Sequence, residues 1–371
     1  MLKLASTQSA RLLERPSAPQ ATPEFRVIGA QPIARWIAAN TQPIFELVSQ
    51  AYLAYAQGKA LNPDSYFLRF PDQPHNRIIA LPASLEQGAA EQPVAGIKWI
   101  ASFPDNVAAG LDRASAVFIL NDRRTGYPLA CLEGSLISAV RTAASAVIGA
   151  HYLHGSDRIK RLGVVGCGLI ALNVIDFLRR MGWQIDAVSL IDHDIARAHA
   201  LARQQPLSGI ACTGGSHIGA IAECDMVLFA TSAGAPHVHD PALFAHKPTV
   251  LHLSLRDLAP AVILSAQNVV DDVQHCLKAQ TSLHLTEQRE GHCGFIAGNV
   301  AELIGAAITP DFRRPRIYSP FGMGMLDLAL AQAIWRSSAD EEVLRYPDFF
   351  PVPYGQHPTN EQPDQPVRQH A

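Results

Sequence analysis

The sequence predicts an α/β protein in which a Rossmann-type doubly wound parallel sheet follows an α+β domain. Between residues 153 and 312 short apolar runs alternate with helical patterns, which is typical of parallel strands joined by helices. Between residues 25 and 152 one helical stretch is followed by several β-rich runs instead. The length of 371 residues, about twice that of a common domain, also favours two domains.

In the first domain IFELVSQAYLAYAQG predicts a helix, and RIIAL, VAGIKWI and ASAVFIL predict strands bounded by turn-forming residues. Asn121, Asp122 and Gly126 lie between two apolar runs, so the stretch AVFILNDRRTGYPLACLEG predicts a hairpin. The small-residue stretch TAASAVIGAHYLHG predicts a helix that ends at Gly155.

In the second domain RLGVVG, AVSLID, DMVLFAT, TVLHLSL and QNVVDD predict strands, and IALNVIDFLRRMG and IARAHALARQ predict helices. The alternation stops near Pro310, and GMLDLALAQAIWR predicts a helix that returns to the first domain. We therefore expect an α+β domain at 25–152 with 313–350, a Rossmann domain at 153–312, an N-terminal extension at 1–24 and a Pro-rich tail at 351–371, either a strap or disordered.

The composition argues against polyanionic and membrane partners. Thirty basic and thirty-three acidic residues give a net charge of -3, which lacks the basic excess that nucleic acid or an anionic membrane favours. Arg11, Glu14 and Arg15 lie where a signal peptide would need its apolar run, and no later stretch approaches twenty uncharged apolar residues. The six cysteines contain no CxxC pair, so we expect reduced thiols and a cytoplasmic protein.

A glycine-rich turn predicts a dinucleotide site. In RLGVVGCGLIALNVIDF an apolar strand meets Gly166, Gly168 and Ala171 and then a helix. Gly166 permits a tight turn, Gly168 lets the backbone approach a pyrophosphate, and Ala171 allows close helix packing. The alternative is a tight turn without a ligand.

Two further positions extend this site. Asp192 closes the second strand and is expected to accept hydrogen bonds from the ribose hydroxyls, so its charge favours NAD over NADP; the alternative is a solvated strand end or cap. Thr231 and Ser232 follow the fourth strand, where they either line the crevice or start a turn.

Four cations of the first domain stand among apolar or small residues: Arg69, Lys98, Arg113 and Arg141. Each could reach solvent through its long side chain. Together they suggest an acidic ligand with several carboxylates, because unpaired buried charges are costly. Lys98 is the candidate for chemistry, since a lysine shifts its pKa more readily than an arginine.

An acid and several histidines complete the set of candidates. Asp257 follows the fifth strand, where it could activate water or an amine, or else cap a helix or pair with Arg256. Glu133 could orient Lys98 or Arg141, or be an ordinary strand-end acid. The pairs in HYLHG and PHVHD match no strong zinc signature, so we expect no metal.

From about Phe25 to Tyr346 the chain resembles the ornithine cyclodeaminase/mu-crystallin family, through YFLRF, AGIKWIASFPDN, AVFILNDRRTGYPLACLEGSLISAVRTAASA, GVVGCGLIALN and SPFGMGMLDLALA. The pairing of SYFLRFPD with RIIALPA and GIKWIAS is similar to the branch that acts on N-(2-amino-2-carboxyethyl)-L-glutamate. The resemblance implies NAD-dependent oxidation of this amine and hydrolysis to 2-oxoglutarate and L-2,3-diaminopropionate, a precursor for siderophores or peptide natural products. It also implies a homodimer formed through the first domain's sheet.

The resemblance also implies site residues. Arg69, Lys98 and Arg141 fall on substrate positions, Asp257 falls on the catalytic aspartate, and Arg113 could add a carboxylate contact. The implied cofactor contacts outside the glycine turn are Thr142, Leu169, Ile170, Thr231, Ser232, Leu255, Gly322 and Met323, the last two along the nicotinamide. The alternative for Met323 is a core residue, which is the more frequent role of a methionine.

One departure from the family separates the possible activities. Cyclodeaminases usually carry a proline-glycine-lysine run after the aspartate, whereas this chain has SLRDLAPAVI, which argues against a cyclising ornithine enzyme. The alternatives are a cyclodeaminase or imine reductase of the same family, and a non-catalytic NAD-dependent binding or regulatory protein.

Overall fold

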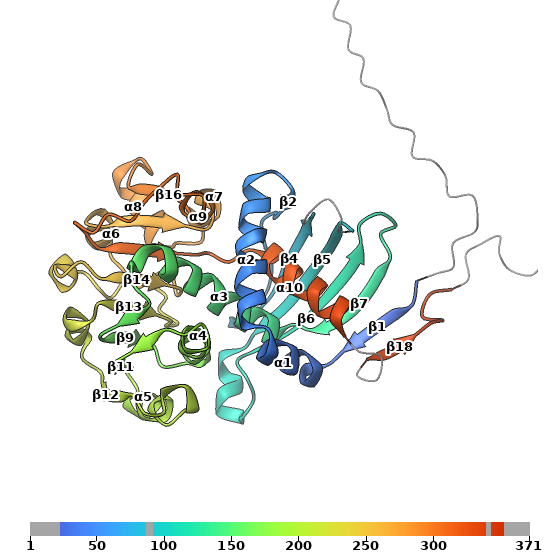
Figure 1. Ribbon diagram of the computed structural model, residues 1–371, viewed down its shortest axis with the longest axis horizontal. Coiled ribbons are helices and arrows are strands. Elements are labelled where there is room, and N and C mark those ends of the chain that lie inside the picture. The colour runs from blue at the N-terminus through green and yellow to red at the C-terminus, as the bar shows by residue number, and fades with distance from the viewer. Residues whose placement is uncertain (1–22, 87–91, 339–342, 352–371) are drawn as a thin grey trace, which may run out of the picture.

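The computed structural model describes residues 23–86, 92–338 and 343–351. Figure 1 shows two lobes, each built on one sheet, with α2 (Thr41–Ala56) and α3 (Ser135–His154) between them. Apart from Pro351, the Pro-rich tail lies outside the described residues, as does most of the N-terminal extension.

The first lobe contains a mixed, mainly antiparallel sheet in the order β18-β1-β7-β6-β5-β4-β2, with β3 also paired to β4. The antiparallel pairing of β6 with β7 confirms the predicted hairpin. Helices α2, α3 and α10 pack on the sheet, and α10 contacts β4 and β5. The elements are β1 (Phe25–Ile28), α1 (Ala30–Ala39), β2 (Ala60–Leu61), β3 (Tyr66–Phe70), β4 (Gln73–Leu85), β5 (Val94–Ser102), β6 (Ala114–Asp122), β7 (Pro128–Glu133), α10 (Gly324–Ser337) and β18 (Leu344–Tyr346).

The second lobe contains a parallel sheet in the order β12-β11-β9-β13-β14-β17-β15-β16. Its first strand in the chain, β9, lies between β11 and β13, which is the strand order of a doubly wound sheet and confirms the predicted fold class. The strands are β9 (Leu162–Val165), β11 (Ala187–Ile191), β12 (Ala211–Gly215), β13 (Met226–Phe229), β14 (Thr249–His252), β15 (Gln267–Val270), β16 (Ile296–Asn299) and β17 (Arg316–Ser319).

Helices join the strands of this sheet, as the alternating pattern predicted. Asp194 caps α5 by accepting a hydrogen bond from the Ala196 N–H, and Asn299 and Glu302 form a capping box at α9. The helices are α4 (Leu169–Arg180), α5 (Ile195–Ala202), α6 (Pro260–Leu264), α7 (Val273–Cys276), α8 (Ser282–Glu290) and α9 (Val300–Ile304); β8 (Arg158–Ile159) and β10 (Gln184–Ile185) form a separate two-stranded sheet.

The return to the first lobe occurs later than the expected boundary at residue 313. Strand β17 lies inside the parallel sheet, between β14 and β15, and all its residues are buried. Only Ile317 and Tyr318 of its four residues are apolar, between Arg316 and Ser319, so the apolar pattern did not reveal this strand. The chain therefore leaves the parallel sheet only after Ser319, and α10 then packs on the first sheet.

Helix α3 connects the two lobes. It ends at Gly155, whose φ of 77° is the left-handed conformation that favours glycine. Gly149 lets the helix approach β17, because a Cβ at this position would lie 2.2 Å from the Tyr318 ring. Among the described residues α3 is long and apolar enough to cross a membrane, and 67% of its most apolar window is buried inside the protein.

Candidate functional site

The glycine turn has a geometry that suits a dinucleotide. Gly166 follows β9 with φ of 90°, and a Cβ there would lie 2.7 Å from the Ala230 carbonyl oxygen. Gly168 is the N-cap of α4, and no side chain caps this helix end. Ala171 is fully buried against the core. The first backbone N–H groups of α4 are therefore available to an anion such as a pyrophosphate.

Asp192 braces the glycine turn. Its carboxylate is buried, and Oδ2 accepts a hydrogen bond from the Cys167 N–H at 2.8 Å. Oδ1 accepts from the Asp194 N–H at 3.0 Å. A carboxylate oxygen accepts more than one hydrogen bond, so these contacts leave lone pairs for ribose hydroxyls. The contact of Asp192 with the ribose remains a prediction.

Other expected cofactor residues lie around this turn and at the sheet edge. Leu169 is exposed at the first position of α4, and Ile170 is partly buried beside it. Thr142 donates its hydroxyl proton to the Ser138 carbonyl at 2.7 Å. Leu255 has φ of 69°, an uncommon conformation for a residue other than glycine. Such strain often occurs at functional sites.

The two residues expected along the nicotinamide differ in position. A Cβ at Gly322, where φ is 95°, would lie 2.8 Å from Nη1 of Arg141, so the backbone approaches this guanidinium closely. Met323 is instead fully buried in the main core cluster. Its side chain does not face an open crevice, so its position does not support the expected ring contact. A flexible methionine fills core space well, which explains this location.

Lys98 lies in a buried ion pair. It is 1% exposed, and its Nζ donates to Asp327 Oδ2 at 2.8 Å and to Ser138 Oγ at 3.0 Å. Nε of Arg141 lies 3.3 Å from the same Asp327 oxygen. Burial and the nearby Arg141 lower the pKa of Lys98 to about 8, although Asp327 opposes the shift. We call Lys98, Arg141 and Asp327 the inner site.

Asp327 was missed by sequence reasoning. It is fully buried on α10, and the available signal was one acid inside the apolar helix GMLDLALAQAIWR. Glu133, the acid considered as a partner of Lys98, accepts hydrogen bonds from the N–H groups of Ser135 and Leu136 instead. It therefore accepts hydrogen bonds from the first turn of α3, whose N-cap is Gly134, and does not orient the lysine.

A second group of cations lies on the same face of the first sheet as Lys98. In the strand pairing Arg69 is opposite Arg77, Arg77 is opposite Ser102, and Ser102 follows Lys98 by four residues on β5. Directly paired residues, and residues separated by an even number along a strand, share a face. Arg69 and Arg77 therefore point to the side on which Lys98 meets α3 and α10.

Arg113 and Arg256 add two charges to this group. Burial lowers the pKa of the Arg77 guanidinium. The positive charges of Arg113, Arg69 and Arg256 lower this pKa further. We call these residues the outer arginine cluster: Arg69, Arg77, Arg113 and Arg256.

No acid of the described residues neutralises the outer arginine cluster. Nε of Arg77 is buried and has no hydrogen-bond partner in the described ranges, and Arg256 donates only to the Ala279 carbonyl, at 2.7 and 3.2 Å. Arg77 was not a candidate in the sequence, because it opens the strand run RIIAL, where a charged first residue is ordinary. The pairing with Arg69 reveals it.

Asp257 lies where the fifth strand's carboxyl end was expected to place it, but it is fully buried. Its Oδ1 accepts from the Thr231 hydroxyl and lies 3.0 Å from His237 Nε2, and Oδ2 accepts from the Ser254 hydroxyl. Burial opposes ionisation, but hydrogen bonds from His237, His252 and Ser254 outweigh it and hold the pKa of Asp257 well below its usual range. Asp257 pairs with histidines rather than with Arg256.

The comparisons with known proteins agree with this architecture. Residues 37–245 match the family described as the ornithine cyclodeaminase/mu-crystallin family. The chain is 28% identical over 316 residues to the N-((2S)-2-amino-2-carboxyethyl)-L-glutamate dehydrogenase of Staphylococcus aureus, covering 82% of this chain and 92% of the relative. It is also 28% identical over 301 residues to the NAD(P)H-dependent anabolic L-arginine dehydrogenase of Pseudomonas aeruginosa, covering 79% and 91%.

Solved structures share the fold at lower identity. The Δ1-pyrroline-2-carboxylate reductase of Thermococcus litoralis, in complex with NADH and L-proline, superposes with a TM-score of 0.76 at 21% identity, over 84% of this chain and 96% of that one. An archaeal alanine dehydrogenase dimer with bound NAD superposes with a TM-score of 0.74 at 23% identity, over 84% of this chain and 95% of that one. Because the family match spans more than half of the sequence, the protein belongs to the ornithine cyclodeaminase/mu-crystallin family.

Proposed function

We propose that the protein oxidises N-(2-amino-2-carboxyethyl)-L-glutamate with NAD and hydrolyses the resulting imine to 2-oxoglutarate and L-2,3-diaminopropionate. The coarser class rests on the relatives, which are NAD(P)-dependent dehydrogenases and reductases of amine substrates. The finer substrate rests on the Staphylococcus aureus relative and on the charges of the site.

The outer arginine cluster is the observation that carries the choice of substrate. Alanine and proline have one carboxylate, which Lys98 and Arg141 would bind in the inner site. The proposed amine has further carboxylates, and these would offset the repulsion among the outer arginines. Arginine suits this task because its planar fork binds a carboxylate through two hydrogen bonds.

The residues divide the remaining tasks. The glycine turn, the N-terminus of α4 and Asp192 are placed to hold NAD, which accepts a hydride from the substrate carbon when it is bound. Lys98, with a pKa of about 8, can take the proton that the substrate amine must lose before oxidation. Asp327 and Ser138 fix the Lys98 ammonium during this step.

We further propose a cytoplasmic homodimer formed through the outer face of the first sheet. Tyr66, Trp99 and Val117 lie in one cross-strand row with Ala80 on the face opposite Lys98, and they are 70%, 42% and 42% exposed. A large apolar row on a sheet face is typical of a protein interface, and one structural neighbour is a dimer. All six cysteines are free thiols, which suits the cytoplasm.

Incubation of the protein with N-(2-amino-2-carboxyethyl)-L-glutamate and NAD tests the function. We expect absorbance of NADH and, by mass spectrometry, equal amounts of 2-oxoglutarate and diaminopropionate. Ornithine, alanine and proline serve as comparison substrates. Release of ammonia and proline from ornithine without net NADH would identify a cyclodeaminase instead. Binding of NAD and substrate with no turnover would support a non-catalytic role.

A further inference from the structure

Asp257 is poorly placed to exchange protons itself. Its side chain is fully buried, and both oxygens already accept hydrogen bonds, from Thr231, His237 and Ser254. Nε2 of His252 lies 3.3 Å from Oδ2, on the remaining side. A carboxylate enclosed in this way has neither access to water nor a free position for a substrate proton. Its position instead suits a group that orients a neighbour.

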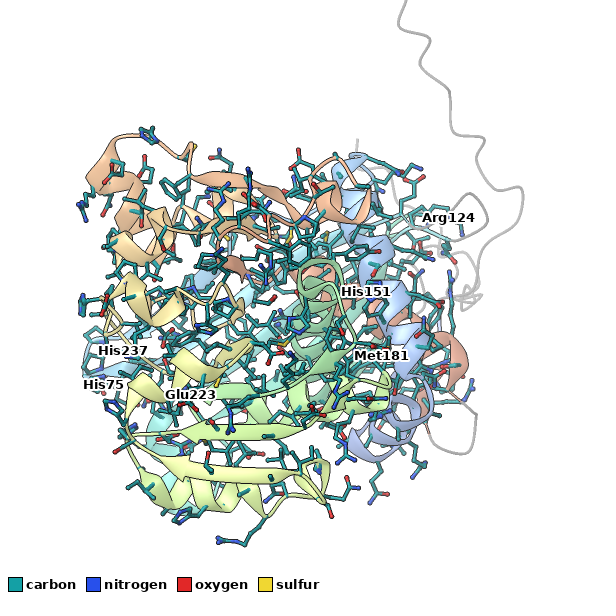
Figure 2. All side chains as sticks on the ribbon, turned by 60° about the vertical axis from the view of Figure 1, so that its left-hand side comes forward. His75, Arg124, His151, Met181, Glu223 and His237 are labelled. Atoms are coloured by element: carbon teal, nitrogen blue, oxygen red, sulfur yellow. The ribbon has the colours of Figure 1, made fainter. Side chains whose placement is uncertain are left out.

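His237 is the neighbour that Asp257 holds and that solvent can reach. Its side chain is 41% exposed, and Nε2 lies 3.0 Å from Asp257 Oδ1. The backbone reinforces this contact, because the His237 N–H donates to the Asp257 carbonyl at 2.9 Å. Figure 2 shows His237 at the left-hand edge of the view, on the segment that follows β13.

The two nitrogens of the His237 ring therefore differ in role: Nε2 donates a hydrogen bond, and Nδ1 can accept a proton. Asp257 can only accept, so Nε2 carries the proton that it shares with this carboxylate. Nδ1 has no hydrogen-bond partner in the described part of the chain. In the neutral form of the ring, Nδ1 is then the nitrogen that can accept a proton.

We propose that His237 Nδ1 is the base for water addition to the imine and that Asp257 is its positioning residue; this inference rests on the proposed function. The water oxygen forms a bond to the imine carbon, the C=N electron pair moves to nitrogen, and the water proton passes to Nδ1. Nδ1 returns this proton to the amine nitrogen, and the C–N bond breaks with its electron pair going to nitrogen. The hydroxyl proton passes to solvent water as the ketone forms, so the cationic imine and water yield the ketone, the amine and one proton. The step consumes one water and no other reactant.

The solvent exposure of Lys98 and His237 indicates which of the two can activate water. Lys98 is 1% exposed and paired with Asp327, so it can serve the bound amine but not incoming water. The half-exposed ring of His237 lies on the loop after β13, at the carboxyl edge where a parallel sheet binds its ligands.

Substitution of His237 tests the proposal. His237→Gln can keep a donor to Asp257 but has no nitrogen that accepts a proton, and His237→Ala removes both functions. We expect both to lower steady-state turnover roughly 100-fold. The first turnover of NADH should be retained, because oxidation precedes water addition. His239→Ala is the matched control, since His239 is exposed on the same loop and should leave turnover unchanged.

Trapping of the imine locates the affected step. Rapid mixing followed by borodeuteride should convert accumulated imine to deuterium-labelled substrate in the His237 variants, and much less in the wild type or in His239→Ala. Turnover of His237→Gln within twofold of wild type would overturn the proposal. Loss of the first NADH turnover in His237→Gln would also overturn it, because the ring would then act before oxidation.

Nitrogen NMR of the cofactor-free protein tests the dyad without any turnover. We expect the His237 ring to carry its proton on Nε2, and the Asp257→Asn variant to lose this preference. A proton on Nδ1 in the neutral wild-type ring would contradict the assignment. If the wild type does not oxidise the proposed amine, the proposed function fails, and the NMR result still decides whether the dyad exists.

Discussion

The inner site and the outer arginine cluster differ in whether the protein itself supplies an acid that neutralises their positive charges. In the inner site Lys98 and Arg141 share the carboxylate of Asp327, and all three groups are largely buried. The outer arginine cluster is more exposed and contains no carboxylate among the described residues. Arg69 and Arg77 of the outer cluster lie on the same face of the first sheet as Lys98, as the strand pairing shows.

The difference follows from the cost of burying charge. An unpaired ion in the interior costs several kcal/mol, roughly, so the inner cations require an acid supplied by the fold. Solvent screens the outer arginines, so they can remain without an acid until a ligand brings one. We infer that the inner site carries the chemistry and that the outer arginine cluster selects substrates with additional carboxylates.

Removal of the inner lysine should have the largest effect. Lys98→Ala is expected to lower kcat about 1000-fold, because the amine then loses its proton acceptor. NAD binding should be unchanged, since the glycine turn lies in the other lobe. Steady-state kinetics and titration with the dinucleotide measure the two effects. Near-normal turnover in this variant would remove Lys98 from the mechanism.

Removal of an outer arginine should change selectivity rather than rate. Arg77→Ala is expected to raise KM for the polycarboxylic amine roughly 10-fold to 100-fold, because the substrate carboxylate loses a hydrogen bond to a charged group. The kcat value should change by less than about threefold, because the arginine does not act on the reacting bond. Arg124→Ala, an exposed cation of the β6–β7 turn, is the control. An unchanged KM would show that the cluster does not bind substrate.

The glycine turn provides a reference outside both groups of cations. Asp192→Ala is expected to weaken NAD roughly tenfold, about 1.4 kcal/mol, while the substrate KM at saturating NAD stays unchanged. Its effect on NADP should be smaller, since the lost charge also repels a 2′-phosphate. Fluorescence titration of both dinucleotides measures this. Equal losses for NAD and NADP would argue that Asp192 acts only by bracing the turn.

The pH dependence of kcat should be the smallest of these effects, and it reports directly on the ionisation of Lys98 in the inner site. Lys98 has a lowered pKa of about 8, so it is protonated below this pH and kcat should fall as the pH decreases through 8. Asp327 raises this pKa, so Asp327→Asn should move the change in kcat to lower pH. Profiles of kcat against pH for the two proteins test this. If kcat of the wild type and of Asp327→Asn fell at the same pH, the pH dependence would have to come from a group other than Lys98.

Sequence reasoning identified the local features of the site and missed the distant ones. The glycine turn, the exceptional Lys98 and the cation Arg69 stand out against their own neighbours in the chain. Asp327 and Arg77 do not, because an acid in a helix and an arginine at the start of a strand are ordinary until their partners are known. The position of Asp257 was predicted, but its enclosure by hydroxyls and histidines was not.

The sequence by itself determined the succession of strands and helices and the glycine turn, because apolar periodicity and backbone conformation act over a few residues. Only the tertiary structure decided which charges are neutralised. Lys98 and Asp327 are 229 residues apart in the chain, and they meet because α10 returns to pack on β5. Electrostatic energy depends on distance and burial in space, and neither is encoded in sequence spacing.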